Sequence, residues 1–241
     1  MKEQLYTIPV NDAFNEDCEC PLCHLYSKLE QDALDFTLGP SYMEEDIREQ
    51  TNKEGFCNNH ILKLYKKQNS LGLANILKTH LFNRIGDIEK LATKSLSRNI
   101  LFKKNTLSPI SEYIIAHNNS CFICNKIDAT FNRYIATILY LYKKDTIDET
   151  SFKKKFNSSK GFCIKHYEML YQAALNTLNG SHLGEFVHDL NTITIENLKR
   201  VDADLDWYID KFDYRYKDEP WKNSKDAIER TILKTNGISV D

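Results

Sequence analysis

Apolar side chains recur every three or four positions along most of this chain, a spacing that places them on one face of an α-helix. The first such stripe covers residues 21–38 and ends at a Gly-Pro pair, residues 39–40. A mostly polar helix is expected over 41–53. A second apolar stripe over 57–91 predicts two helices separated near residues 69–72. The pattern favours long helices over strands.

The second half of the chain follows the same plan. A strongly apolar helix is predicted at 122–141, a shorter one at 147–156, and another from Cys163 onward. After a break at 179–181, a long amphipathic helix is expected to continue to Phe212. We therefore expect an all-α, internally duplicated helical bundle with a first half at 1–100, a second half at 101–212 and a C-terminal segment at 213–241.

The C-terminal segment loses the helical period and becomes dense in aromatic and charged side chains. Such a composition is unlike that of disordered tails, so residues 213–226 are expected to form a strap followed by a short helix at about 225–234. The strap either has a structural role only or offers a binding surface, because Arg and aromatic side chains dominate binding hot spots. In the second case the contacts would be Tyr214, Arg215, Trp221 and Asp226.

A short cysteine-histidine signature occurs twice, in the same order, about a hundred residues apart. Each copy consists of a CxxC pair followed by GFCxxH. The first copy supplies Cys20, Cys23, Cys57 and His60, and the second supplies Cys121, Cys124, Cys163 and His166. Three thiols and one imidazole at these spacings are the donor set of a closed tetrahedral zinc site. We expect one Cys3His site in each half, built from the ligands of that half, and therefore two Zn²⁺ per chain.

Other uses of the cysteines remain open. An iron–sulfur cluster is the main alternative metal species. Cys20 to His24 also spell CxxCH, the haem attachment pattern, but the second copy has Asn125 in place of the histidine. A redox-active dithiol is a further alternative, although no thioredoxin-like βαβ pattern surrounds CPLC. The seventh cysteine, Cys18, is either an extra ligand or a bystander.

A second repeated motif, HxxNxI, follows the glycines of both halves. It contains His80 and Asn83 in the first half and His188 and Asn191 in the second. Residues three apart share a helix face, so each His-Asn pair is expected to be adjacent. The pairs either satisfy a neighbouring backbone or act as additional ligand or catalytic groups.

Composition narrows the class of protein. The 241 residues are 41% hydrophobic and 27% charged, which is typical of a globular protein, and no apolar run has the length of a membrane span or a signal peptide. We therefore expect a cytoplasmic protein with no membrane partner, in which thiols stay reduced and available to metal.

Charge is unevenly distributed along the chain. Lys and Arg number 3 against 12 acidic residues in 1–50, 22 against 12 in 51–200, and 7 against 10 in 201–241. The basic middle either complements the acidic ends or binds nucleic acid.

Several segments together resemble a known family. The combination of TIPVNDAF, CPLC, GFCNNH, a second CxxC, GFCIKH and DKFDYRYKDEPWKNSKDA is similar to an uncharacterised bacterial family known only as a domain of unknown function. The resemblance covers nearly the whole chain. It implies a bacterial cytosolic protein and brings no activity.

No catalytic motif stands out, so the sequence does not favour an enzyme. The leading interpretation is a zinc-stabilised binding or adaptor protein of unknown protein partner. The alternatives are a cysteine-based redox or metal-responsive regulator and a nucleic-acid-binding protein.

Overall fold

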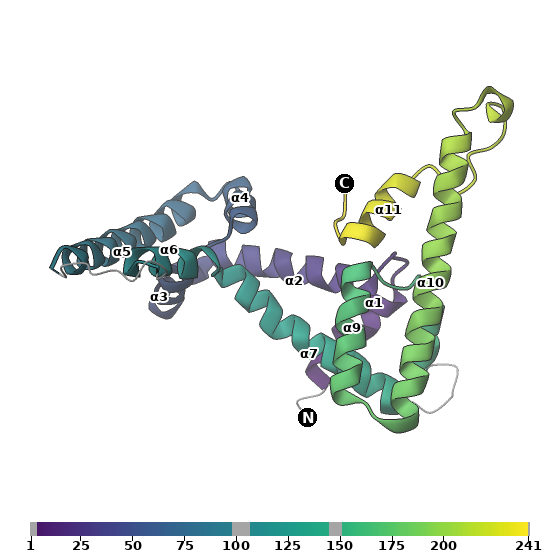
Figure 1. The fold of residues 1–241 in the computed structure, drawn as a ribbon, viewed down its shortest axis with the longest axis horizontal. Helices are drawn as coiled ribbons and strands as arrows, with labels where there is room; N and C mark the ends of the chain where they lie inside the picture. Colours follow the sequence, from purple (N-terminus) through teal and green to yellow (C-terminus); the bar gives the residue numbers. More distant parts are fainter. Residues whose placement is uncertain (1–3, 98–106, 145–150, 241) are drawn as a thin grey trace. The chain divides into compact units, whose positions relative to one another are not determined.

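The computed structural model describes residues 4–97, 107–144 and 151–240 (Figure 1). Over these residues the backbone forms eleven α-helices, two short 3-10 helices and no strand, which confirms the all-helical prediction. In chain order the elements are α1 (Gln4–Asn15), α2 (Pro21–Leu38), η1 (Pro40–Met43), α3 (Glu45–Glu54), α4 (Asn58–Lys66), α5 (Ser70–Ser97), α6 (Pro109–Asn118), α7 (Phe122–Lys144), α8 (Phe152–Ser158), α9 (Ile164–Thr177), α10 (Gly180–Asp210), η2 (Tyr214–Tyr216) and α11 (Ala227–Asn236).

Most helices lie where the apolar period predicts them. The helix expected at 21–38 is α2, and the stripe over 57–91 forms α4 and α5, separated by a turn in which Gln68 has a φ of 60°. The expected helix at 147–156 is described only from Phe152, as α8, because residues 145–150 lie outside the described part.

Helix α6 was missed by the periodicity. Its ten residues begin with a clear signal, since the Ser108 hydroxyl accepts a hydrogen bond from the Ser111 amide and Pro109 occupies the first helical position. None of its residues is buried, so the apolar stripe on which the prediction depended is weak here.

The chain divides into two compact units that do not follow the two signature copies in order. Unit 1 contains Met1–Lys28 and Phe131–Asp241, and unit 2 contains Leu29–Thr130. Helices α2 and α7 each contribute residues to both units.

Unit 1 has an aromatic core. The Phe14 ring contacts Phe152 edge-on at a centroid distance of 5.0 Å, and Tyr142 meets Phe186 at 4.9 Å. Phe162, the aromatic residue of the second GFC motif, is fully buried in this cluster and contacts Phe14. Buried aromatic side chains contribute a large apolar area, so the turn that carries Cys163 is fixed by the core of unit 1.

Unit 2 has a smaller, mainly aliphatic core. Helices α3, α4 and α6 pack against α5, and Leu64 and Ile76 are buried between them. Long stretches of α5 remain exposed, including Leu81 and Phe82. Phe56, the aromatic residue of the first GFC motif, is only half-buried, in contrast with Phe162.

Candidate metal centres

All eight signature residues lie at helix beginnings. Cys20 and Cys121 directly precede α2 and α7, and the second cysteine of each pair follows in the first turn. Cys57 and Cys163 are the N-cap residues of α4 and α9. Free amide groups and the helix dipole favour negative charge at these positions, so the backbone supports thiolate ligands.

Glycines form the turns that lead into the two CxxH segments. Gly55 and Gly161 have φ values of 65° and 72°, a conformation that side chains rarely adopt. A Cβ on Gly161 would also lie 2.8 Å from the carbonyl oxygen of Ile193. The motif therefore needs glycine for both conformation and space.

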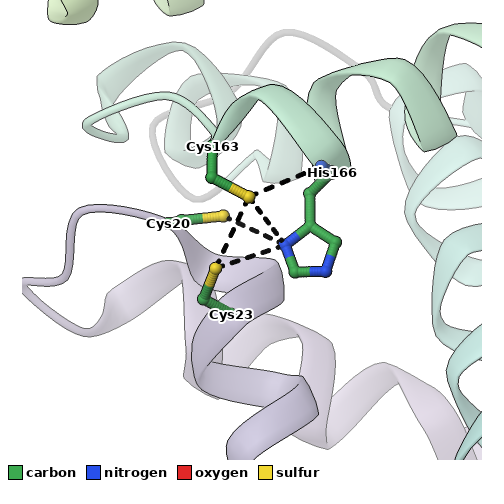
Figure 2. Close-up of side chains that lie close together, drawn as sticks. All are labelled: Cys20, Cys23, Cys163 and His166. Atoms are coloured by element: carbon green, nitrogen blue, oxygen red, sulfur yellow. Dashed lines mark hydrogen bonds between the residues drawn. The ribbon is translucent and has the colours of Figure 1, made fainter. Parts of the chain in front are cut away.

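The first cluster, here called site 1, consists of Cys20, Cys23, Cys163 and His166 in unit 1 (Figure 2). The Nδ1 atom of His166 lies 3.5 Å from Cys20 Sγ and 3.3 Å from both Cys23 Sγ and Cys163 Sγ. The Sγ atoms of Cys23 and Cys163 are 3.6 Å apart. The three sulfurs surround one ring nitrogen.

The second cluster, site 2, consists of Cys57, His60, Cys121 and Cys124 in unit 2. The Nδ1 atom of His60 lies 3.3 Å from each of the three sulfurs, and Cys57 Sγ is 3.9 Å from Cys124 Sγ. The Phe122 amide donates a 3.0 Å hydrogen bond to the Gly55 carbonyl, which joins the two ligand-bearing segments.

Both clusters have dimensions that fit one tetrahedral metal ion. Zinc binds sulfur at about 2.3 Å and imidazole nitrogen at about 2.0 Å, so neighbouring ligand atoms of a tetrahedron lie about 3.5–3.8 Å apart. In each cluster the four ligand atoms lie within 4.8 Å of one another. All seven cysteines are free thiols, so no disulfide competes for these sulfurs. The residues that the sequence singled out as ligands are thus brought together in two Cys3His groups.

The pairing of these residues differs from the expectation. We expected each half to build its site from its own ligands, but each cluster joins the CxxC pair of one copy to the CxxH segment of the other. The contacts between segments show what produces this pairing. The Phe122 amide donates to the Gly55 carbonyl, which joins the turn before Cys57 to the beginning of α7. The Lys234 ammonium donates to the carbonyls of Glu19 and Lys160, which joins the segments that lead into Cys20 and Cys163.

The charges within site 1 favour a bound cation. Hydrogen bonds from the Cys20 and Cys23 thiols lower the pKa of Cys163. Burial and the neighbouring Cys163 raise the pKa of Cys20 to about 12, and the same neighbour raises the pKa of Cys23. Without a cation the group thus holds one thiolate, because like charges at this distance repel. A divalent cation would stabilise the thiolate form of all three cysteines.

Site 2 brings a thiol of low pKa beside an imidazole of high pKa. Burial raises the pKa of Cys121, but hydrogen bonds from His60 and from the backbone amides of Cys124 and Cys57 together outweigh burial and bring the value to about 6. Burial also opposes protonation of His60, yet hydrogen bonds to Cys121 and Glu30 raise its pKa to about 10. Metal binding at this site therefore has to displace protons.

The outer face of the histidine differs between the two sites. His60 Nε2 lies 3.1 Å from a carboxylate oxygen of Glu30, which also pairs with Lys63 at 2.5 Å. This is the carboxylate–histidine arrangement that orients a metal ligand and raises its basicity. His166 Nε2 is buried and has no hydrogen-bond partner among the described residues, although the ring contacts Phe131 at a centroid distance of 5.3 Å. The sequence did not predict a role for Glu30, because this residue lies outside the cysteine-histidine signature.

Helix α11 supplies a second contact that the sequence did not indicate. The Lys234 side chain is 1% exposed, and its ammonium donates to the carbonyls of Glu19 at 2.6 Å and Lys160 at 2.5 Å. These residues directly precede Cys20 and the GFC turn of site 1. The sequence did not predict that Lys234 is buried, because its burial depends on contacts with two loops that are distant in the sequence.

The HxxNxI motifs have different environments in the two copies. His80 Nδ1 lies 3.1 Å from the Asn52 carbonyl, and His80 Nε2 lies 3.2 Å from Nε2 of His117. His188 is exposed, and its neighbour Asn191 accepts a hydrogen bond from the Tyr167 hydroxyl. Neither histidine belongs to a metal cluster among the described residues, and Cys18 does not either.

Three of the four strap residues singled out for binding have partners in the structure. Arg215 pairs with Asp213, and Asp226 pairs with Arg230. Trp221 packs at a tilt on Tyr208, while Tyr214 is 87% exposed. Tyr214, Arg215 and Asp226 are all largely exposed, and Tyr214 is the most exposed of the four.

Comparison with known proteins gives a family and no relatives of known activity. A family model described as "Family of unknown function (DUF6062)" matches residues 1–241. No curated protein and no solved structure matches the chain. Among the described residues, no helix has both the length and the apolar character that crossing a membrane requires.

Proposed function

Because the chain belongs to this family of unknown function, whose description names no activity, we propose a function from the two clusters: a zinc-stabilised helical binding or adaptor protein. The resemblance noted in the sequence is confirmed by the family match. The observation that carries the proposal is the convergence of three sulfurs and one imidazole nitrogen at helix beginnings, twice in one chain.

Zinc is the ion that this donor set favours. Cys3His is a common structural zinc set, and four protein ligands leave no position for water or substrate. Site 1 and site 2 would therefore serve folding rather than catalysis. Structural zinc sites contribute apparent binding free energies of about 10–16 kcal/mol in zinc-finger peptides, enough to decide whether a unit folds.

The adaptor role is supported by exposed apolar side chains at the end of α10 and in the strap. Phe212 is 74% exposed and Tyr214 is 87% exposed, so a partner could bury both. We place the protein in the cytoplasm, where thiols remain reduced and available to zinc. The duplicated signature would have arisen by internal duplication of a helical unit.

Metal analysis of the purified protein tests the proposal. Inductively coupled plasma mass spectrometry should find two zinc ions per chain, and cobalt substitution should give the visible absorption of tetrahedral thiolate-bound Co²⁺. Charge-transfer bands of iron and sulfide, with iron in place of zinc, would support an iron–sulfur protein instead. A chain that folds fully without metal would contradict the proposal.

A further inference from the structure

We propose that the two metal ions differ in how readily they exchange: the ion of site 1 is held beneath α11, whereas the ion of site 2 is open to competing ligands. The inference rests on the proposed zinc binding and assigns the two sites different regulation. It follows from what covers each set of ligand atoms.

Three of the four ligands of site 1 are inaccessible. Cys163 is 0% exposed, Cys20 is 1% exposed and His166 is 3% exposed, which leaves only Cys23 half-buried. An incoming ligand would thus have a single sulfur to approach. In site 2 both Cys57 and Cys124 are half-buried, and Asn58 and Asn59 beside Cys57 are exposed.

Helix α11 closes site 1 through a buried charge. The Lys234 ammonium binds the carbonyl groups of Glu19 and Lys160, so it joins the two segments that carry the cysteines. It also lies 3.3 Å from the Glu19 carboxylate, which pairs with Arg200 at 2.5 Å. Hydrogen bonds to charged groups are the stronger ones, and breaking them leaves a buried charge unpaired.

The residue after α11 extends the cover to the sulfur itself. A Cβ placed on Gly237 would lie 3.5 Å from Cys163 Sγ. The backbone at the end of α11 therefore lies close to this sulfur. A competing ligand can approach site 1 at Cys23, but full release of the metal also requires α11 to move away from Cys163.

Site 2 lacks such a clamp within the described part of the chain. Among all described residues the buried lysines are Lys211 and Lys234, and both belong to unit 1. Lys211 binds carbonyls of the strap, so no buried lysine lies near site 2. Glu30 supports His60 at Nε2, on the side of the ring away from the sulfurs. Glu30 thus increases affinity at site 2 without covering Cys57 or Cys124.

The first experiment uses the intact two-zinc protein. Excess 4-(2-pyridylazo)resorcinol should remove zinc in two phases of equal amplitude, with the slow phase at least about tenfold slower because helix detachment breaks charged hydrogen bonds. Pulsed alkylation with N-ethylmaleimide, read by mass spectrometry, should modify Cys57 and Cys124 before Cys20 and Cys163. A single phase, or the reverse order of alkylation, would overturn the proposal.

A matched pair of variants identifies the clamp. Lys234→Met removes the buried ammonium, and the slow phase should approach the fast one. Lys225→Met changes an exposed lysine just before α11 and should leave both phases unchanged. If Lys234→Met left the slow phase as it is in the unaltered protein, α11 would not be the cover.

These outcomes are distinct from a failure of the zinc proposal itself. Fewer than two bound metal ions in the purified protein would contradict the proposed function before any exchange is measured. Two ions that leave at one rate would leave that function intact and refute only the difference between the sites.

Discussion

At the scale of single residues, the candidate metal ligands are easier to recognise than the groups that support them. The signature identified all eight residues of the two clusters, because their spacing has few other uses. Glu30 and Lys234 were missed since each acts through a contact with a segment far away in the sequence: Glu30 with His60, and Lys234 with Glu19 and Lys160. Neither contact has a local pattern.

Removal of the Glu30 carboxylate should weaken site 2 alone. Glu30→Ala leaves His60 Nε2 without its acceptor, and the loss of such a partner typically costs about 10–100-fold in metal affinity. Competition against a chelator of known affinity should show this decrease for one of the two zinc ions. Asp32→Ala, which changes an exposed acidic residue of the same helix, is the control and should leave both affinities unchanged. Equal weakening of both ions would contradict the assignment of Glu30 to site 2.

At the scale of elements, periodicity located the helices because burial of one face is their main source of stability. It gave no helix at α1, which has Pro9 in its interior, and it failed at α6, whose ten residues are all exposed or half-buried. The structure shows why glycine begins each GFC turn: Gly55 and Gly161 both have positive φ values, and the segments against which they pack belong to other helices.

Gly161, in the second GFC turn, allows a test with a matched control. Gly161→Ala should lower the free energy of unfolding by at least about 1–2 kcal/mol, because the left-handed conformation alone costs that much for other residues. Contact with the Ile193 carbonyl adds to this loss. Gly184→Ala, within α10 and in open space, should instead stabilise the protein by up to about 1 kcal/mol. Denaturant unfolding of the zinc-loaded protein measures both, and a neutral Gly161→Ala would show that the turn is more adaptable than its geometry indicates.

At the scale of the whole molecule, the sequence indicated two sites but not which residues share each site. Each copy carries a complete donor set, so local reasoning paired the ligands within a copy. The crossed pairing depends on contacts between distant segments, such as the hydrogen bond from the Phe122 amide to the Gly55 carbonyl, and such contacts leave no local pattern in the sequence. The two compact units each contain one complete site made from both copies.

Loss of one cysteine from each site should reveal this crossed pairing. In Cys57→Ser, amide hydrogen exchange should increase at the beginnings of α4 and α7, while the beginning of α2 keeps its protection. In Cys163→Ser the increase should appear at the beginnings of α9 and α2. Each variant should also lose one zinc ion. Increased exchange at the beginning of α2 in Cys57→Ser would favour pairing within a copy.

The crossed pairing also sets an order of events during synthesis. The four residues of site 2, from Cys57 to Cys124, all lie between Cys23 and Cys163 in the sequence, so the residues of site 1 flank them on both sides. A ribosome therefore releases the complete inner set while the first two cysteines still await their partners. Because chains fold as they emerge, unit 2 can acquire its ion first, and the earliest thiols to be made are the last to be protected.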